Sequence, residues 1–273
     1  MCNKVTCKIL SLLHLLVMAN PFSYIGSKTQ RFLDEFGQIS RLLGRAFSYL
    51  PRIGRDRRLL FKQMEHIGTG SVPLVLVIGF FTGMVAAWQA AYQFKGLITF
   101  SFIGSAVSRA IFIELGPVLC AIVIAGRVGA SIAAELGTMK VTEQIDALET
   151  LGIHPIRYLA TPRILAAIIM LPILTVFANF IALFGAFVVC NFFLDITAKV
   201  FFDSVKRFFT VKDVIGGLIK AVFFGGTTAL IGVYVGLKTS GGAEGVGNAS
   251  IRAFVLAASM VLIMDYILWT IIF

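Results

Sequence analysis

The hydrophobic pattern of this chain consists of long apolar runs separated by short polar segments. Each run has about the 20 residues that a helix needs to cross the hydrocarbon core of a bilayer. Alternating patterns typical of β-strands are not the dominant feature of these runs. We predict spanning helices at about residues 72–94, from Pro117 onward, and at about 164–190, 217–237 and 252–273. The chain is therefore expected to be an all-α membrane protein with about five transmembrane helices.

A break is predicted in front of the second span. Gly116 and Pro117 interrupt a mainly apolar stretch that extends from Leu97 to Leu136. A proline fits the first turn of a new helix but disrupts the middle of an existing one, because it lacks the N–H and its ring clashes with the preceding turn. The pattern therefore predicts a separate short or re-entrant segment before Gly116 and a full span after it.

The N-terminal region has a different pattern, which is amphipathic and basic. Apolar residues recur at steps of three and four between Phe32 and Leu50, and Pro51 follows. Residues 1–70 contain eleven lysine and arginine residues and four acidic ones, which accounts for +7 of the net charge of +10. A basic amphipathic helix typically lies in the membrane interface.

Three regions are predicted on this basis. They are an N-terminal extension at 1–28, an interfacial amphipathic region at 29–70 and a transmembrane domain at 71–273. The apolar run 9–19 resembles the core of a signal peptide, but it is too short to span a bilayer. Cleavage after it would send the basic region outside, against the positive-inside rule, so we expect an uncleaved, cytoplasmic N-terminus.

Composition narrows the class of protein. Hydrophobic residues make up 58% of the chain and charged residues 14%, against roughly 25% charged residues in soluble domains. An apolar chain with net charge +10 suits an anionic membrane surface and not nucleic acid. The four cysteines and three histidines have no metal-ligand spacing, and there is no phosphate-binding loop. We expect no metal and no cofactor bound by this chain.

Two polar patterns follow the predicted break. Arg127, Ser131 and Glu135 recur at four-residue steps, which predicts a polar seam on one helix face. The seam is either a functional element near the cytoplasmic mouth or a self-satisfied network that fixes helix packing. Thr142 then begins a short predicted helix that extends to Leu151, with an acidic residue at every third position. This helix is either a docking element or a solvated surface helix.

Two carboxylates lie inside predicted spans, Glu114 and Asp265. A carboxylate in hydrocarbon is costly, so it usually faces a cavity or a partner of opposite charge. Glu114 and Asp265 are therefore predicted to be either polar elements of a cavity or structural pairs, with Arg109 as the partner of Glu114.

Three motifs together resemble a known family. They are Glu-Leu-Gly-Pro at 114–117, AGRVGASIAAELGTM at 125–139 and TEQIDALETLGIHP at 142–155. From about residue 61 to the C-terminus, the chain resembles the MlaE-type (YrbE-like) permeases. These are the membrane subunits of ABC lipid-transport systems that work with MCE-domain proteins.

The resemblance implies a transport mechanism. A half-permease of this type would act as a homodimer, with a cytoplasmic ATPase that binds the ATP and with phospholipid held between the copies. Its short cytoplasmic helix would be the coupling helix that docks on the ATPase, with candidate residues Glu143, Gln144, Asp146, Leu148 and Glu149. The candidate walls of the lipid cavity are Phe94, Leu97, Glu114 and Asp265. The expected location is a bacterial inner membrane or the plastid inner envelope.

One departure and two alternatives accompany this resemblance. Some family members carry a basic residue directly before Glu-Leu-Gly-Pro, where this chain has Ile113, and Arg109 lies one turn earlier. A proton-coupled secondary transporter that uses Glu114 and Asp265 is the main alternative, although the inverted repeats typical of such proteins are not evident. An intramembrane enzyme is a third reading, but the usual catalytic motifs do not occur.

Overall fold

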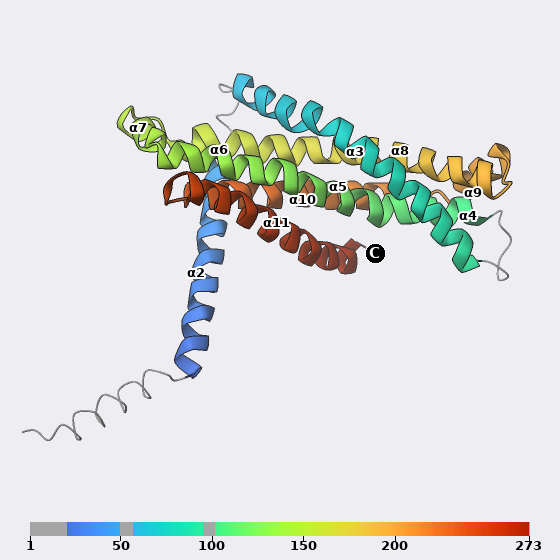
Figure 1. Ribbon diagram of the computed structural model, residues 1–273, viewed down its shortest axis with the longest axis horizontal. Helices are drawn as coiled ribbons and strands as arrows, with labels where there is room; N and C mark the ends of the chain where they lie inside the picture. Colours follow the sequence, from blue (N-terminus) through green and yellow to red (C-terminus); the bar gives the residue numbers. More distant parts are fainter. Residues whose placement is uncertain (1–20, 50–56, 95–101, 273) are drawn as a thin grey trace, which may run out of the picture. The chain divides into compact units, whose positions relative to one another are not determined.

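The computed structural model describes residues 21–49, 57–94 and 102–272 (Figure 1). Contacts within the chain divide it into two compact units, residues 1–44 and 45–273. Helix α2 (Pro21–Ser48) covers most of the amphipathic stretch. Its position in the membrane interface stays a prediction. The signal-like run 9–19 and the candidate Leu97 lie outside the described residues.

Five helices in the described residues are long and apolar enough to cross a membrane, as predicted. Several of them are built from consecutive shorter elements. The full order is α3 (Arg57–Phe94), α4 (Ile103–Ala110), η3 (Ile111–Leu115), α5 (Gly116–Ile124), η4 (Ala125–Gly129), α6 (Ala130–Val141), α7 (Gln144–Thr150), η5 (Ile156–Ala160), α8 (Thr161–Phe193), α9 (Ala198–Arg207), α10 (Val211–Leu237) and α11 (Gly242–Ile272).

The helices begin earlier than the apolar runs do. Helix α3 starts at Arg57 where the pattern predicted a span from about 72, and α10 starts at Val211 in place of about 217. Hydropathy marks where a helix meets hydrocarbon, whereas backbone hydrogen bonding continues into polar turns beyond it. The glycine-rich segment 240–247 is helical from Gly242 onward. Gly241 and Gly242 have positive φ values of 93° and 68°, and helix α11 follows directly.

The break predicted at Pro117 takes a different form. In place of a separate segment, one continuous helix of 39 residues extends from Ile103 to Val141. The π-helical turn η3 precedes the proline, and the N–H of Gly116 donates to the carbonyl of Ile111, five residues back. A π-helical turn adds one residue to a helical turn without ending the helix. The wider turn therefore accommodates Pro117 at the start of α5 within the same span.

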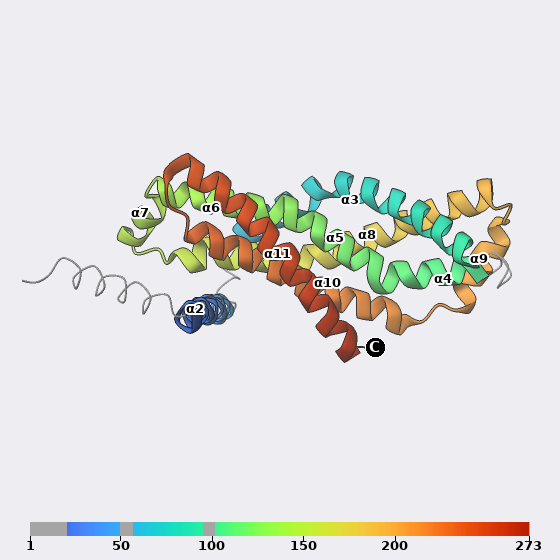
Figure 2. The same cartoon turned by 60° about the horizontal axis from the view of Figure 1, so that its bottom comes forward.

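Helices α3 and α8 lie side by side in both ribbon views (Figures 1 and 2), and small residues line their contact. A Cβ atom at Gly83 would overlap the carbonyl oxygen of Ala182, and one at Gly79 would lie 3.1 Å from the carbonyl oxygen of Ala178. Small residues permit close backbone approach where no hydrophobic effect drives helices together. These glycines therefore set the distance between α3 and α8.

Helix α10 uses the same device against the α4–α6 helix. A Cβ atom at Gly232 would lie 2.7 Å from the carbonyl oxygen of Gly129, and one at Gly236 would lie 2.7 Å from the Cβ of Leu136. Gly232 and Gly236 are four residues apart, so they form one packing face of α10. Figure 1 also shows that α7 and α9 lie at opposite ends of this bundle.

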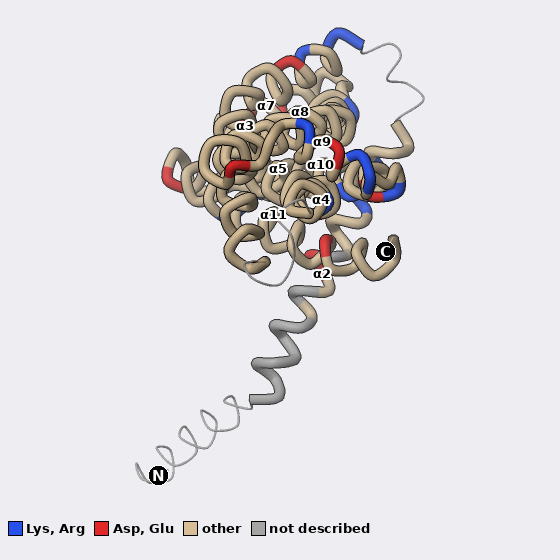
Figure 3. Tube along the Cα trace, turned by 90° about the vertical axis from the view of Figure 1, so that its right-hand side faces the viewer, with Lys and Arg blue, Asp and Glu red and all other residues tan. Residues whose placement is uncertain are grey.

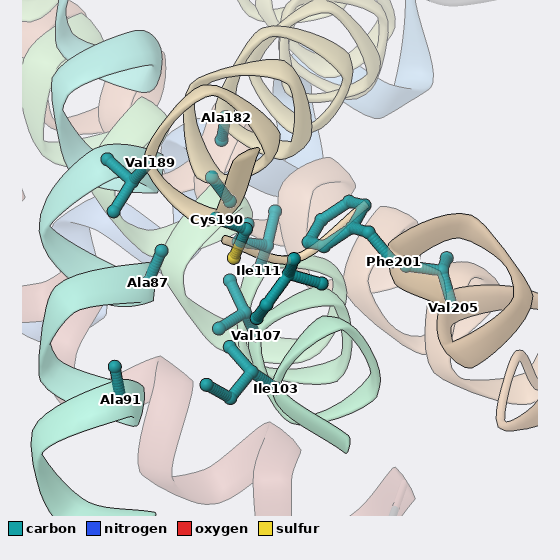
Figure 4. Packing of buried hydrophobic residues seen from close by; sticks show 12 residues of the cluster. Ala87, Ala91, Ile103, Val107, Ile111, Ala182, Val189, Cys190, Phe201 and Val205 are labelled. Atoms are coloured by element: carbon teal, nitrogen blue, oxygen red, sulfur yellow. The ribbon is translucent and has the colours of Figure 1, made fainter. Parts of the chain in front are cut away.

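A buried apolar cluster closes the end of the bundle near α9 (Figure 4). It joins α3, α4, α8 and α9 through small or branched side chains and one aromatic ring, that of Phe201. The cluster includes Ala87, Ala91, Ile103, Val107, Val189, Cys190, Phe201 and Val205. Phe94 packs against this cluster. The short helix α9 is therefore anchored to the ends of three longer helices.

We expect the substitution Gly83→Ala to destabilise the protein by about 1–3 kcal/mol, because the added methyl group requires α3 and α8 to separate. The melting temperature of the purified protein in detergent micelles measures this effect. Gly247→Ala in α11 is the control, since no atom lies within 4 Å of a Cβ there. The control should be neutral or slightly stabilising. Equal stability of the two variants would contradict the assigned contact.

Candidate functional site

The short helix predicted after the second span is present as α7, Gln144–Thr150. Its N-terminus differs from the prediction, because Thr142 does not cap it and its hydroxyl donates to the carbonyl of Thr138 at 2.8 Å. The preceding residue, Glu143, has left-handed backbone conformation (φ 59°) and turns the chain into α7. A left-handed residue reverses chain direction over a very short distance, so α7 stands directly at the end of α6.

The side chains of α7 divide into tethered and exposed groups. The ammonium of Lys140 donates to Asp146 at 2.7 Å, which ties α7 to the last turn of α6. Ile145 is buried. The candidate docking residues Glu143, Gln144 and Glu149 are exposed, and Leu148 is half-buried. The acidic edge of α7 is therefore accessible, although one of its carboxylates already has a partner within the chain.

The predicted polar seam separates into two contacts with different helices. The guanidinium of Arg127 donates to the hydroxyl of Ser71 on α3 at 2.6 Å. Glu135 accepts a hydrogen bond from Arg163 on α8 at 2.9 Å. The π-helical turn η4 contains Arg127, and it changes the direction in which side chains point along this helix. Ser131 lies between the two contacts and is half-buried, so the arrangement agrees with the packing interpretation.

A cluster centred on Lys220 joins both predicted intramembrane carboxylates. The Lys220 ammonium donates to Glu114 at 2.7 Å and to Asp265 at 2.8 Å. The ammonium also lies 4.9 Å from the ring centre of Trp269. Its side chain is fully buried, with 0% exposure. Three separate helices, α4–α6, α10 and α11, therefore meet at one cation.

Lys220 was missed from the sequence because it lies close to the predicted start of its span, where a lysine can extend to the interface. A signal was available, because a lysine inside an apolar helix needs a nearby anion and the two intramembrane carboxylates Glu114 and Asp265 had been recognised. The prediction that Arg109 pairs with Glu114 is wrong. Arg109 instead donates to Asp213 at 2.9 Å, because α10 begins early enough to bring Asp213 beside α4.

Glu114 and Asp265 line one groove of about 400 Å³ between the α4–η3 segment and α11. Arg109, Ala110, Ile113, Tyr266 and Trp269 complete its lining. Figure 2 shows that the C-terminal end of α11 diverges from the other long helices. Two of the four cavity candidates are thus together in one groove. Phe94 lies elsewhere, against the apolar cluster that closes the bundle.

Comparison with known proteins identifies the family. The family model described as Permease MlaE matches residues 60–271. The chain belongs to the MlaE permease family. A probable ABC transporter permease of Rickettsia felis is 37% identical over 257 residues, which cover 94% of this chain and 99% of that protein. The probable ABC transporter permease slr1045 of Synechocystis is 40% identical over 83% of this chain and 86% of its own length.

A plant relative extends the family further. The Arabidopsis protein TRIGALACTOSYLDIACYLGLYCEROL 1, chloroplastic, is 35% identical over 77% of this chain and 60% of its own length. Together with five membrane-spanning helices, these matches identify the chain as an ABC transporter permease subunit, a multi-pass membrane protein that works with an ATPase. Within the described residues, no group of three His, Cys, Asp or Glu side chains could hold a metal ion.

We expect Lys220→Met to destabilise the permease by about 3 kcal/mol, because it leaves two carboxylates in the bundle without their cation. The value is at the low end of the range for a broken buried pair, since the Glu114 side chain is 38% exposed. Thermal unfolding in micelles measures the loss. Adding Glu114→Gln and Asp265→Asn should restore most of it, and Lys199→Met is the control, because the Lys199 side chain on α9 is exposed. A Lys220→Met variant as stable as the parent protein would contradict the bridging role.

Proposed function

We propose that this permease moves phospholipid or a related lipid between membranes, with an MCE-domain partner and with energy from its ATPase. The observation that carries the proposal is the charged cluster of Glu114, Lys220 and Asp265 at the wall of an open groove. Charged groups at membrane depth usually mark a substrate pathway. The name of the Arabidopsis relative contains that of a galactolipid, which also favours a lipid substrate.

The groove suits an amphiphile because its charged and apolar parts adjoin. Glu114, Asp265 and Arg109 form the polar part. Beside it, α11 exposes large apolar side chains, with Leu262 54% and Ile263 53% exposed. A lipid would place its head group at the charged end and its chains along the apolar face of α11.

A second copy of the permease would complete the cavity. The apolar stretch of α11 is the least buried of the five spans, with 17% of its 18 residues buried within the chain. The groove is bordered by α11 on one side and opens at the surface. We propose that two copies face each other along this open side, so that the lipid lies between them.

The ATPase would dock at α7, on the cytoplasmic side of the membrane. Its exposed acidic edge, with Glu143 and Glu149, is complementary to a basic surface. The Lys140–Asp146 pair and the direct continuation from α6 provide a rigid connection to the groove-lining helix. ATP-driven movement of the ATPases would thus reach Glu114 through a single helix. We place the permease in a bacterial inner membrane or the plastid inner envelope, with a cytoplasmic N-terminus.

The alternative function is proton-coupled transport through Glu114 and Asp265. Carboxylate pairs in membranes do serve as proton relays. Here both carboxylates already hydrogen-bond to one ammonium, Lys220. A shared cation holds both groups in place, which favours a fixed binding wall over a relay.

We expect Asp146→Lys combined with Glu149→Lys to reduce the amount of ATPase that co-purifies with the permease by about tenfold, because like charges would meet at the docking surface. Quantitative co-purification from membranes measures the loss. Asp203→Lys is the control, because α9 lies at the opposite end of the bundle (Figure 1). If the double variant retained both assembly and lipid transport, α7 would not be the docking element.

We expect ATP to drive lipid transfer by the reconstituted permease–ATPase complex, and a protonophore to leave the rate within about twofold, since no proton gradient enters the proposed cycle. Transfer of a fluorescent phospholipid from proteoliposomes to acceptor vesicles measures the rate. A variant of the ATPase without hydrolysis provides the baseline. Transfer that stopped with the protonophore and continued without ATP would instead support the proton-coupled alternative.

A further inference from the structure

The ion pairs around the groove do not balance. Among the described residues, they join two cations, Arg109 and Lys220, to three carboxylates, Asp213, Glu114 and Asp265. With every group ionised, the cluster carries one negative charge. An uncompensated carboxylate at membrane depth is costly, so it favours a cation that reaches it from the groove.

Glu114 is the carboxylate that a ligand would meet. Its side chain is 38% exposed, whereas that of Asp265 is 14% exposed and that of Asp213 is 6% exposed. Its bond to Lys220 uses one carboxylate oxygen, Oε2. The Glu114 side chain, which also carries the second oxygen, lines the groove. The negative charge of the cluster is therefore presented mainly at one accessible side chain.

Arg109 presents positive charge to the same groove. Its side chain is 52% exposed, and in the described part of the chain its hydrogen bond to Asp213 uses only Nε. This bond does not use the two terminal nitrogens of the guanidinium, and Asp213 holds the guanidinium in place. Guanidinium groups bind phosphate through such paired donors. Arg109 is therefore suited to a phosphodiester.

Two aromatic side chains of α11 border the negative end. Tyr266 is 73% exposed and Trp269 is 43% exposed, and both line the groove with Glu114. Aromatic faces attract ammonium groups, including the quaternary ammonium of choline. Trp269 already lies beside the ammonium of Lys220, which demonstrates that its ring is oriented toward a cation. An acidic group and an aromatic surface together favour an ammonium ligand.

We propose that the groove selects zwitterionic phospholipid head groups, with the phosphodiester on Arg109 and the ammonium at Glu114 beside Tyr266. This inference rests on the proposed function, because it names the head group that the lipid site takes. Arg109 and Glu114 are on consecutive elements, α4 and η3, which places a positive and a negative group along one wall. A head group with both charges matches that wall, whereas an anionic head group brings no cation for the excess negative charge of the cluster.

The test is direct lipid binding by the purified full-length permease in detergent micelles. The probes are phospholipids with the same fluorophore on one acyl chain and with ethanolamine, choline or glycerol head groups. We expect the two zwitterionic probes to bind about tenfold more tightly than the glycerol probe, which corresponds to one charge-assisted contact. Fluorescence titration gives the dissociation constants.

Two substitutions separate the roles of the two charges. Glu114→Gln should bring the three affinities within about twofold of one another by weakening only the zwitterionic probes. This variant keeps the Lys220–Asp265 pair, so the buried ammonium retains a counter-ion. Arg109→Gln should weaken all probes by about tenfold and leave their ratio unchanged, and Arg109→Lys should restore much of that loss.

Tyr266→Ala tests the same site without removing a charge that stabilises the fold. The Tyr266 side chain is exposed and lies outside the ion pairs. The substitution should weaken the choline probe about threefold more than the glycerol probe. Equal binding of all head groups by the parent protein, or a preference that survives Glu114→Gln, would overturn this inference and leave lipid transport intact. Absence of binding by every probe would instead count against the proposed function itself.

Discussion

The burial of the Lys220 ammonium is the interaction on which the arrangement of the site depends. A fully buried lysine in a membrane helix is tolerated only when carboxylates surround it, and here they come from two other helices. Glu114 and Asp265 are separated by more than half of the transmembrane domain in sequence, and the cation holds both at one wall. The same bond therefore positions the groove and fastens α10 and α11 to the α4–α6 helix.

Departures from regular α-helical geometry place the other polar groups. The π-helical turns η3 and η4 contain Glu114 and Arg127, and each of these residues bonds to a different helix. An extra residue in a turn rotates all later side chains relative to earlier ones. One long helix can thus direct charge toward α10 at one level and toward α3 at another. Figure 3 shows that most of the described trace carries no charged residue. The direction of each charged side chain is therefore important for how the helices pair.

Much of the fold and part of the site could be predicted. Apolar runs predicted five spans because bilayer thickness imposes a minimum length, and the acidic pattern after residue 142 predicted the short helix α7. Spacing did not specify the partners of Arg127 and Glu135, which lie on two different helices. The break predicted at Pro117 did not occur, because the π-helical turn η3 accommodates the proline within one continuous helix.

The sequence by itself determined that this is a helical, five-span permease with two costly carboxylates in its membrane domain, because hydropathy and motifs are local properties of the chain. Only the tertiary structure decided which charges pair. Lys220 joins Glu114 to Asp265, and Arg109 bonds to Asp213 in place of Glu114. Pairing depends on which helices are neighbours and on where each begins. Those features result from close glycine packing and helix register, which the order of apolar and polar residues does not specify.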